Sequence, residues 1–401
     1  MRTQLADLLK DTPEGKEAED ILRRCVHCGF CLATCPTYQL LGDERDSPRG
    51  RIYLMKQVLE GEQATAQVQL HLDRCLTCRA CETTCPSGVR YGRLADIGRN
   101  LVDAQVRRPW LDRLQRSILR AVLPYPERFA PLVKLAGLLR PLAPPGLRRK
   151  ILLPAPAAPW PNPRHARTML VLDGCVQPVL APSINAAAAR VLDRLGISLI
   201  AAPKAGCCGA VSYHLSAQEE GRDFMRRNID AWTPYLDQGC EAIVMTASGC
   251  GVMVKDYAEA LRHDPDYADK AARISAKTLD LAEVLAQEDL SPLRVGAGRR
   301  VAFQSPCSLQ HGQKLDGLVE ELLTRLGFTL TTVADPHLCC GSAGTYSLLQ
   351  PDISLRLLDS KLKNLEAGQP ACIATANIGC LAHLQTGSDV PVLHWVELLD
   401  S

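Results

Sequence analysis

The 401-residue sequence lacks the features of several common protein classes. Aromatic residues make up only 4% of it, which leaves few rings to stack on bases, and no groove-reading motif is present, so nucleic-acid binding is not expected. No segment reaches the roughly 18 uninterrupted apolar residues of a membrane-spanning helix, and the first residues lack the apolar core of an export signal. We therefore expect a cytoplasmic chain, either free or held peripherally on the inner face of the cell membrane.

The sequence also has no nucleotide-binding motif. It contains neither a G-x-G-x-x-G run after a predicted strand nor a P-loop. The chain is thus expected to bind no flavin or nicotinamide of its own, and no residue is assigned a catalytic role. Its length exceeds that of one ordinary core and predicts two or three domains.

Cysteine, in contrast, is abundant, with 18 residues. In a reducing compartment such thiols hold metal or carry out redox chemistry and do not form a disulfide framework. Eight of them form two copies of C-x2-C-x2-C-x3-C followed by proline, at residues 25–36 and 75–86. In two-cluster ferredoxins the fourth cysteine of each run ligates the other cluster. We therefore assign to one 4Fe-4S cluster Cys25, Cys28, Cys31 and Cys85, and to a second Cys75, Cys78, Cys81 and Cys35. A pair of zinc sites is the alternative, but zinc does not require the crossed fourth cysteine.

The segment between the two motifs is predicted to be helical from Pro48 to a stop at Gly61, with Ile52, Met55 and Leu59 on one face. Such a spacer predicts a helical two-cluster ferredoxin domain over residues 1–100, unlike the compact bacterial ferredoxin. Gly29 is expected to let the backbone approach a cluster closely. Three arginines are interpreted as a solvated helix end, with partner contact or tuning of a cluster potential as alternatives: Arg45, Arg49 and Arg51.

Positive charge is concentrated in residues 107–167, which hold 13 lysines and arginines against two acidic residues. Within the predicted basic region 101–140, amphipathic helices are expected at 109–124 and 129–140. The first presents Arg113, Arg116 and Arg120 away from its apolar face, and it could lie on anionic lipid, dock on a partner or pack on its own domain. Residues 141–163 hold eight prolines and predict a semi-rigid, extended linker over 141–167.

Beyond the linker the sequence repeats itself, because Cys307 follows Cys175 at the same distance, 132 residues, that separates the two Cys-Cys-Gly runs. The first repeat is expected over 168–290 and the second over 299–401. Each alternates three short apolar strands with helices, which predicts a parallel α/β sheet with cysteines at the carboxyl ends of its strands. Four cysteines per repeat could hold one further iron-sulfur cluster each: Cys175, Cys207, Cys208 and Cys250, and Cys307, Cys339, Cys340 and Cys380.

The alternative for these eight residues is that buried cysteines act as small apolar side chains. Two cysteines outside the shared pattern, Cys240 and Cys372, are interpreted as packing residues. Two histidines near the loops, His214 and His311, could be ligands or proton carriers, and more often such residues are ordinary loop histidines.

The ferredoxin motifs, the proline-rich linker and the paired cysteine-rich repeats closely resemble, in this order, the iron-sulfur subunit of bacterial glycolate oxidase (glycolate dehydrogenase). The resemblance covers nearly the whole chain and is carried by runs such as PTYQLLGDERDSPRGRIYLMKQVLEG, AGCCGAVSYHL and HLCCGSAGTY. It implies a multidomain α+β protein with a helical ferredoxin module and two tandem α/β cysteine-rich (CCG) repeats.

The resemblance further implies that FAD-containing partner subunits oxidise glycolate to glyoxylate, and that this chain passes the electrons through 4Fe-4S clusters to a quinone or another acceptor. One departure is that the C-x-x-C ending common in CCG repeats is absent, because Ala247 and Asn377 take the place of its first cysteine. Other functions considered are the same relay for a lactate or glycerol-3-phosphate flavoprotein, a catalytic subunit of the heterodisulfide reductase kind, and a zinc-stabilised scaffold.

Overall fold

A computed structural model describes residues 1–154, 156–293 and 296–400. The chain divides into two compact units, Met1–Arg116 with His337–Lys361, and Ser117–Pro336 with Leu362–Ser401. The chain passes from one unit to the other within α7 (Trp110–Val122) and α20 (Pro351–Glu366). Two positions that the predictions included, Ala155 in the linker and Ser401 at the end of the second repeat, lie outside the described residues. The predicted domain boundaries stay predictions.

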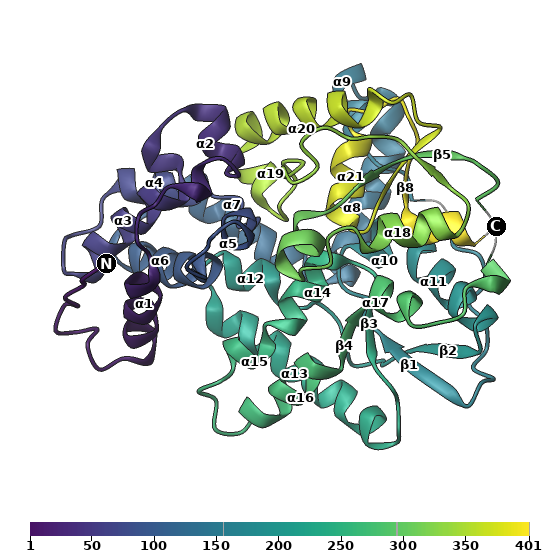
Figure 1. Ribbon diagram of the computed structural model, residues 1–401, viewed down its shortest axis with the longest axis horizontal. Coiled ribbons are helices and arrows are strands. Elements are labelled where there is room, and N and C mark those ends of the chain that lie inside the picture. The colour runs from purple at the N-terminus through teal and green to yellow at the C-terminus, as the bar shows by residue number, and fades with distance from the viewer. Residues whose placement is uncertain (155, 294–295, 401) are drawn as a thin grey trace. The chain divides into compact units, whose positions relative to one another are not determined.

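The first unit is helical in its described part (Figure 1). Its core joins apolar side chains of three helices, among them Ile21, Met55 and Leu94, which are almost fully buried. The α-helices of this unit are α1 (Pro13–Arg24), α2 (Pro36–Leu41), α3 (Pro48–Leu59), α4 (Ala66–Asp73), α5 (Ala80–Thr83), α6 (Tyr91–Gln105) and α19 (Tyr346–Leu349).

Helix α3 confirms the helix predicted between the two cysteine motifs. Ser47 caps it by accepting a hydrogen bond from the Gly50 amide, and Pro48 occupies the first turn, where its missing N–H costs nothing. Ile52, Met55 and Leu59 are all buried, as their spacing predicted. The helix therefore fixes the distance between the two motifs.

The segment His337–Lys361, although it comes from the second predicted repeat, packs within the first unit. The hydroxyl of Tyr346 donates to the carbonyl of Arg74 at 3.0 Å, and the guanidinium of Arg356 donates to that of Leu40 at 3.1 Å. No sequence pattern predicted this packing, because contacts between residues some 270 positions apart leave no periodic signal.

The second unit contains two four-stranded parallel sheets with the same strand order, β2-β1-β3-β4 and β6-β5-β7-β8 (Figure 1). The strands are β1 (Arg167–Val171), β2 (Ile197–Ala201), β3 (Ile243–Met245), β4 (Thr278–Asp280), β5 (Arg300–Gln304), β6 (Thr329–Leu330), β7 (Cys372–Thr375) and β8 (Val392–His394). The predicted pair of parallel α/β repeats is confirmed. The prediction of three strands per repeat was wrong. Each predicted strand is followed by a cysteine loop, whereas no cysteine loop follows β4 or β8 to indicate a strand there.

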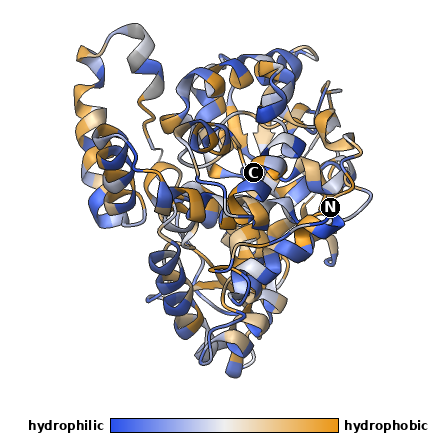
Figure 2. Cartoon of the chain, turned by 90° about the vertical axis from the view of Figure 1, so that its left-hand side faces the viewer, coloured by the Kyte–Doolittle hydropathy of each residue, from blue (hydrophilic) through white to orange (hydrophobic). Residues whose placement is uncertain are grey.

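Helices flank both sheets, and most of them carry one hydrophobic and one hydrophilic side (Figure 2). The core of the first repeat gathers around Trp232, Met225 and Ile243, all fully buried. The α-helices of this unit are α8 (Pro126–Leu139), α9 (Pro145–Lys150), α10 (Gln177–Leu180), α11 (Ser183–Arg194), α12 (Ala210–His214), α13 (Gln218–Asp237), α14 (Ser248–Lys255), α15 (Tyr257–Ala260), α16 (Ala268–Lys277), α17 (Leu281–Ala286), α18 (Leu318–Arg325) and α21 (Ile378–Gln385). Within the described residues, none of the helices combines the length and the hydrophobicity needed to cross a bilayer.

The two repeats contact each other through the ends of their outer strands. His394, at the end of β8, lies 2.8 Å through its Nε2 from the carbonyl of Thr246 in the first repeat. Asp280, at the end of β4, accepts a hydrogen bond at 3.0 Å from the amide of Gln313 in the second. The repeats are thus held to each other by matching positions.

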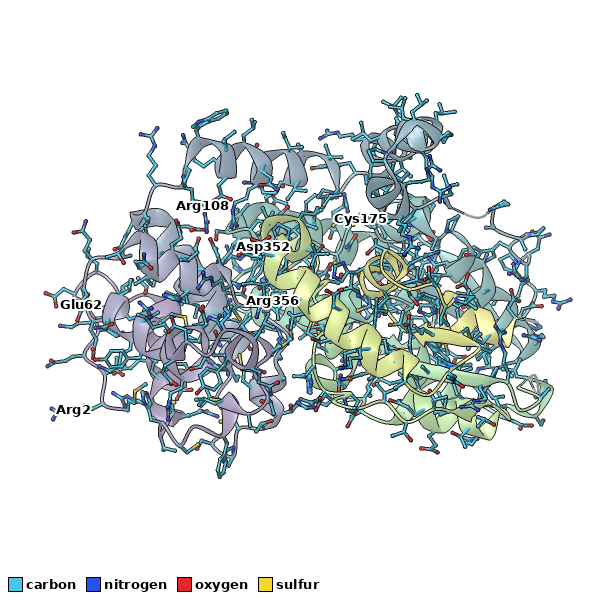
Figure 3. All side chains as sticks on the ribbon, turned by 90° about the horizontal axis from the view of Figure 1, so that it is seen from above. Arg2, Glu62, Arg108, Cys175, Asp352 and Arg356 are labelled. Carbon is cyan, nitrogen blue, oxygen red and sulfur yellow. The ribbon has the colours of Figure 1, made fainter. Side chains whose placement is uncertain are left out.

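Helices α7 and α8 confirm the two amphipathic helices predicted in the basic region, but the arginines of that region are partly neutralised within the chain. Arg108, labelled in Figure 3, pairs with Asp73, Asp103 and Asp112. Arg116 also pairs with Asp73 and Asp112. Several large apolar side chains on these helices are exposed, namely Trp110, Leu111, Leu114, Ile118, Leu132, Leu135, Leu138 and Leu139. The surface of α7 and α8 is consequently more apolar and less basic than the sequence suggested.

The predicted linker is not extended throughout. Residues Pro145–Lys150 form the short helix α9, which begins with a proline at its first position. Farther along, the indole of Trp160 donates to the carbonyl of Leu199, and Arg164 pairs with Asp193. The last part of the predicted linker is therefore anchored on the first sheet.

A pH dependence of stability follows from the burial of His394. Its Nδ1 accepts the amide of Val396 while Nε2–H donates to Thr246, so the ring must be neutral to cap the last helical turn. Burial lowers its pKa to about 4, below its ordinary value of 6.5. Between these two pKa values the unfolded chain binds a proton at His394 that the folded chain does not bind. The free energy of unfolding therefore falls by about 3 kcal/mol as pH drops from about 6.5 to 4.

We expect His394→Asn to remove most of this dependence, since an asparagine oxygen can still cap the helix but does not titrate. The measurement is the urea midpoint of both chains at several pH values. Burial raises the pKa of Asp280 to about 6, which makes stability rise as pH falls, opposite to the effect of His394. Both chains contain Asp280, so the effect of His394 is the difference between their pH dependences. Equal slopes for the two chains would contradict the prediction.

Candidate iron-sulfur sites

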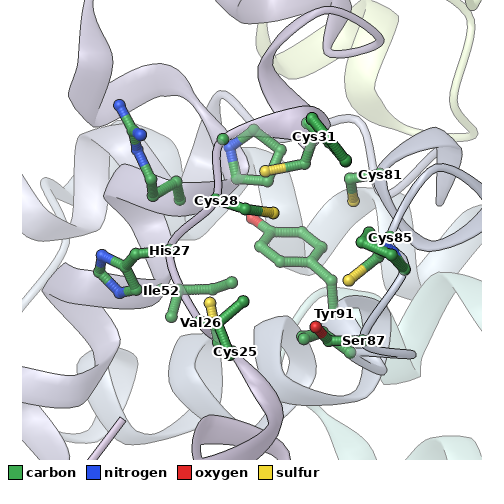
Figure 4. Close-up of a pocket in the computed structure, with 16 residues that line it drawn as sticks. Cys25, Val26, His27, Cys28, Cys31, Ile52, Cys81, Cys85, Ser87 and Tyr91 are labelled. Carbon is green, nitrogen blue, oxygen red and sulfur yellow. The ribbon is translucent and has the colours of Figure 1, made fainter.

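The first cysteine motif borders a pocket in the helical unit. Figure 4 shows the sulfur atoms of Cys25, Cys28, Cys31 and Cys85 directed toward its interior, where Tyr91 also lies. Cys81 lines the same pocket. The structure thus brings the first predicted set of four together, with the fourth thiol supplied by the second motif.

The second predicted set borders a neighbouring pocket of the same unit. Its lining includes the four cysteines of that set together with Arg51 and Tyr91: Cys35, Cys75, Cys78 and Cys81. Cys35 comes from the first motif and the other three from the second. Each pocket therefore receives cysteines from both motifs.

The two motifs share an unusual backbone. His27 and Thr77, each two residues after the first cysteine of its motif, have φ of 56° and 53°. Gly29 and Arg79 correspond in the same way, with φ of 86° and 60°. Arginine takes the glycine position in the second motif, so the left-handed conformation is the feature that the two motifs share. Close approach of the Gly29 backbone to a cluster stays a prediction.

The surroundings of Arg51 correct its interpretation as part of a solvated helix end. Its side chain is 1% exposed and donates to the carbonyl of His71 at 2.6 Å and to the hydroxyl of Thr37 at 3.1 Å. Its second guanidinium nitrogen lies 3.4 Å from the fully buried carboxylate of Asp46. The other two arginines are paired: Arg45, which is exposed, with Asp43, and Arg49, which is partly exposed, with Glu44. Spacing could not distinguish the three, since they occupy the same helix end.

The buried carboxylate of Asp46 lies close to Asp43 and His71, a set of side chains that could be taken for a cation site. Its two oxygens are already engaged, one by His71 and Arg51 and the other by Arg74 at 2.9 Å. Two guanidinium groups at this carboxylate disfavour a metal cation there.

The thiols of the two pockets differ in acidity. Burial raises the pKa of Cys31 to about 11 and raises that of Cys25 as well. Burial would also raise the pKa of Cys75, but the guanidinium groups of Arg51 and Arg99 lower it below its ordinary value. Cys81, fully enclosed, has a pKa raised by burial and by its cysteine neighbours. Positive charge therefore favours an anionic sulfur at Cys75.

The four cysteines of the first repeat converge in the second unit. Cys175 follows β1, Cys207 and Cys208 follow β2, and Cys250 lies in α14 after β3, so parallel strands bring them to one edge of the sheet. Neighbouring thiols of this set are joined by hydrogen bonds and not by disulfides: Cys175 with Cys207, Cys207 with Cys208, and Cys208 with Cys250. The predicted set is thus contiguous.

A buried polar frame holds the Cys207–Cys208 loop. Asn228 donates to the carbonyl of Cys207 at 2.9 Å and accepts the amide of Gly206, while the hydroxyl of Tyr257 donates to the carbonyl of Cys208 at 2.9 Å. Sequence reasoning missed Asn228 and Tyr257, which lie on helices with no motif.

An aromatic pair covers the outer side of this site. Phe224 packs on Cys175 and Cys207, and the ring of Tyr125 lies 5.7 Å from that of Phe224. Tyr125 stands at the start of α8, so the basic region contributes directly to the first repeat. The site is enclosed on this side by apolar surface.

The second repeat distributes its cysteines over both units. Cys307 and Cys380 belong to the second unit, and Cys339 and Cys340 to the first. At Cys380 the structure explains one departure from the common CCG pattern. The amide of Asn377 donates to the sulfur of Cys380 at 3.6 Å, and its oxygen accepts the amide of Gly249 at 3.1 Å. Asn377 therefore links the cysteine loops of the two repeats.

The remaining predicted residues lie as follows. Cys240 and Cys372 are buried, and the sulfur of Cys240 donates to the carbonyl of Thr168, which agrees with a packing role. His214 ends the short helix α12, with its ring edge-on to that of Tyr213. His311 lies in a π-helical turn of residues Ser308–Gly312 after Cys307. Both histidines make further interactions of their own.

The chemistry of the two ferredoxin pockets fits 4Fe-4S clusters. The first is bordered by five thiols and the second by four, with Cys81 common to both. Soft thiolates from several directions are the ligands that such clusters require. All 18 cysteines are free, so none of these thiols is consumed in a disulfide. The first CCG site also offers four free thiols, three of them buried.

Comparison with known proteins agrees with this chemistry. Residues 21–89 match the 4Fe-4S dicluster domain, and residues 169–255 and 301–385 match the cysteine-rich domain CCG. The glycolate oxidase iron-sulfur subunit of Escherichia coli (strain K12) is 56% identical, over 100% of this chain and 98% of that protein. The probable glycolate oxidase iron-sulfur subunit of Bacillus subtilis (strain 168) is 30% identical, over 95% and 94%. Lactate utilization protein A of Geobacillus thermodenitrificans (strain NG80-2) is 26% identical, over 56% of this chain and 95% of its own.

Proposed function

Because the chain belongs to the family of glycolate oxidase iron-sulfur subunits, we propose that it carries electrons, singly and through protein-bound 4Fe-4S clusters, from FAD on partner subunits to a quinone or another acceptor. The family resemblance predicted from the sequence is confirmed, and the chain is a subunit of an oxidoreductase complex. Flavin takes two electrons from its substrate and can release them one at a time, which is the step that a chain of clusters serves.

One observation carries this proposal. Each of the two crossed sets of four cysteines borders its own pocket in the helical unit. In the proposal, one cluster is held by Cys25, Cys28, Cys31 and Cys85, and the other by Cys35, Cys75, Cys78 and Cys81. A bound cluster accepts and donates one electron at a time, and the residues of this chain hold it, set its charge environment and limit its access to water.

The CCG sites are proposed as additional cluster sites. In the first repeat the four thiols are in contact, buried hydrogen bonds from Asn228 and Tyr257 hold the Cys207–Cys208 loop, and Phe224 packs on the site. A set of thiols held in this way is suited to bind a cluster. Ala247 and Asn377 stand where many CCG repeats have another cysteine, which disfavours a disulfide-cleaving catalytic subunit. Attachment to the inner face of the membrane is a further part of the proposal, supported by the exposed apolar side chains of α7 and α8.

The testing experiment is the determination of iron and acid-labile sulfide in the anaerobically purified full chain, with electron paramagnetic resonance after reduction. We expect about eight irons if only the two ferredoxin sites are loaded, and about twelve or more if a CCG site also binds a cluster. A colourless chain with bound zinc and no sulfide would contradict the proposal.

A further inference from the structure

The two ferredoxin pockets have matching backbones. His27 and Thr77 share the left-handed conformation, and the amide of each donates to the first cysteine of its motif, Thr77 to Cys75 at 3.4 Å and His27 to Cys25. These two amides therefore act alike on the first sulfur of each set. The charged side chains and the access of water, in contrast, differ between the two pockets.

At the second pocket the side chains leave a net positive charge, of which Arg51 is fully buried. Arg51 and Arg74 both contact the carboxylate of Asp46, so two guanidinium groups face one buried acid. Arg99 adds a third cation, donating to the carbonyl of Cys75 at 2.6 Å and to the hydroxyl of Thr77 at 2.8 Å. The hydroxyl of Tyr91 also donates to the sulfur of Cys75, at 3.5 Å.

A fourth arginine and a second acidic residue, both beside this pocket, leave its net charge unchanged. Arg79 lines the pocket, and Glu82 follows it one turn later on α5. Both side chains approach Gly92, whose amide donates to Glu82 at 2.5 Å. One positive and one negative charge at the same place largely offset each other.

At the first pocket the charges are paired or reach water. Arg49 lines it, but its guanidinium pairs with Glu44 at 2.8 Å, and the two side chains are 33% and 46% exposed. The ammonium of Met1 donates to the carbonyl of Cys25 at 2.9 Å in a partly exposed position. Water screens such charges far more than it screens Arg51, which is 1% exposed.

From these contacts we infer that Arg51, together with Arg99, makes the second ferredoxin site the more easily reduced of the two. That site is the set Cys35, Cys75, Cys78 and Cys81. The inference rests on the proposed function, in which both sites hold clusters. Reduction adds one electron and no proton to a site that thiolates already make anionic, and the donor, proposed to be the partner's flavin, loses that electron. A buried cation stabilises the more negative, reduced state.

A direction of electron transfer follows. In this inference, electrons that enter the ferredoxin module collect at the second site. The segment His337–Lys361 belongs to the same unit as both ferredoxin pockets. That segment contacts the second motif where Tyr346 donates to the carbonyl of Arg74, one residue before Cys75. It also carries Cys339 and Cys340 of the second CCG repeat. By this inference, electrons leave the ferredoxin module from its second site.

The test is a potentiometric titration of the full chain, purified anaerobically with its clusters and followed by electron paramagnetic resonance. In Arg51→Gln, which keeps a donor for the carbonyl of His71 but removes the charge, we expect one of the two midpoint potentials to become more negative. The equilibrium constant for electron sharing between the sites should fall at least about tenfold, which is about 59 mV for one electron. In Arg51→Lys, which keeps the positive charge, this midpoint potential should stay close to that of the unaltered chain.

Two further variants separate charge from structural damage. Asp46→Asn removes the acid that offsets Arg51 and should move the same midpoint in the opposite direction, which a loosened site would not do. Arg45→Gln, a neutralised arginine of the same region that is exposed and paired with Asp43, should move neither midpoint. Cys78→Ser, which alters a ligand of the second set, identifies the resonance that belongs to that site.

The inference is overturned if Arg51→Gln retains its iron and neither midpoint moves, or if both move equally. If Arg51→Gln loses iron, the test uses Arg99→Gln and Asp46→Asn instead. The midpoint potential of the second site should become more negative in Arg99→Gln and more positive in Asp46→Asn. If these opposite shifts are absent, the inference is overturned as well. Iron and sulfide in the unaltered chain test the proposed function independently. Eight irons with midpoints indifferent to Arg51 would refute this inference and leave the proposed function standing.

Discussion

Replacing Cys81 by serine is expected to stop electron transfer from glycolate to an external acceptor in the assembled complex, while glycolate still reduces the flavin of the partner subunits. Cys81 is buried and lines both ferredoxin pockets, so its loss removes a ligand at the point where the two sites adjoin. The iron content should fall by about four per chain. The measurements are iron and sulfide, flavin bleaching by glycolate and reduction of a quinone analogue.

The matched control is Cys240→Ser. Cys240 is also a buried thiol, but its sulfur donates to the carbonyl of Thr168, a contact that a serine hydroxyl can make, and it lines neither ferredoxin pocket. This variant should keep both its iron and its rate of acceptor reduction. If acceptor reduction survived in Cys81→Ser, the route through the ferredoxin sites would be wrong. If Cys240→Ser lost as much iron, the loss would reflect general damage.

Replacing Gly209 by alanine is expected to destabilise the second unit by about 3 kcal/mol and to open the first CCG site. Gly209 follows the two adjacent cysteines and has φ of +90°, where an L side chain is strained by about 1 kcal/mol or more. A Cβ there would also lie 2.6 Å from the carbonyl oxygen of Gly221 on α13, which forces the loop and helix apart. The corresponding Gly341 has φ of +92°, and its Cβ would lie 2.5 Å from the carbonyl oxygen of Ser354.

The control is Gly239→Ala, because Gly239 has nearly the same φ, +94°, but no atom within 4 Å of the added Cβ. It should cost only about 1 kcal/mol, the conformational part alone. The measurements are the urea midpoint of the full chain and the rate at which a thiol reagent labels Cys207 and Cys208. Equal losses for the two variants would show that the close approach of the CCG loop to α13 is unimportant.

Local patterns predicted a large part of the fold. The first-turn proline and apolar spacing of α3, the apolar spacing of α7 and the short runs before Cys175 and Cys307 all correspond to elements that the structure contains. These signals are readable because they depend on neighbours within one or two helical turns or one strand. The strands β4 and β8 were missed, since no cysteine loop follows them to indicate the end of a strand.

Charged residues were the least predictable part. Arg51 was grouped with Arg45 and Arg49, yet it alone is buried, because the carboxylate of Asp46 and the carbonyl of His71 receive its guanidinium. Arg120, for which lipid, a partner or its own domain were the alternatives, pairs with Glu220 of its own chain. Partners so distant in sequence cannot be inferred from composition.

The sequence by itself determined the ligand chemistry of this protein: two interleaved sets of thiols with a fixed spacing, and a duplicated pattern of cysteines that follow short parallel strands. Spacing suffices there, because ligand loops are short and each cysteine is specified by its neighbours in the motif. Only the tertiary structure decided which charges surround each set, how the His337–Lys361 segment packs with the ferredoxin module, and which helices enclose the first CCG site. The physical reason is that burial and ion pairing depend on side chains brought together from distant parts of the chain, and the energy of a charge depends on how much water those side chains exclude.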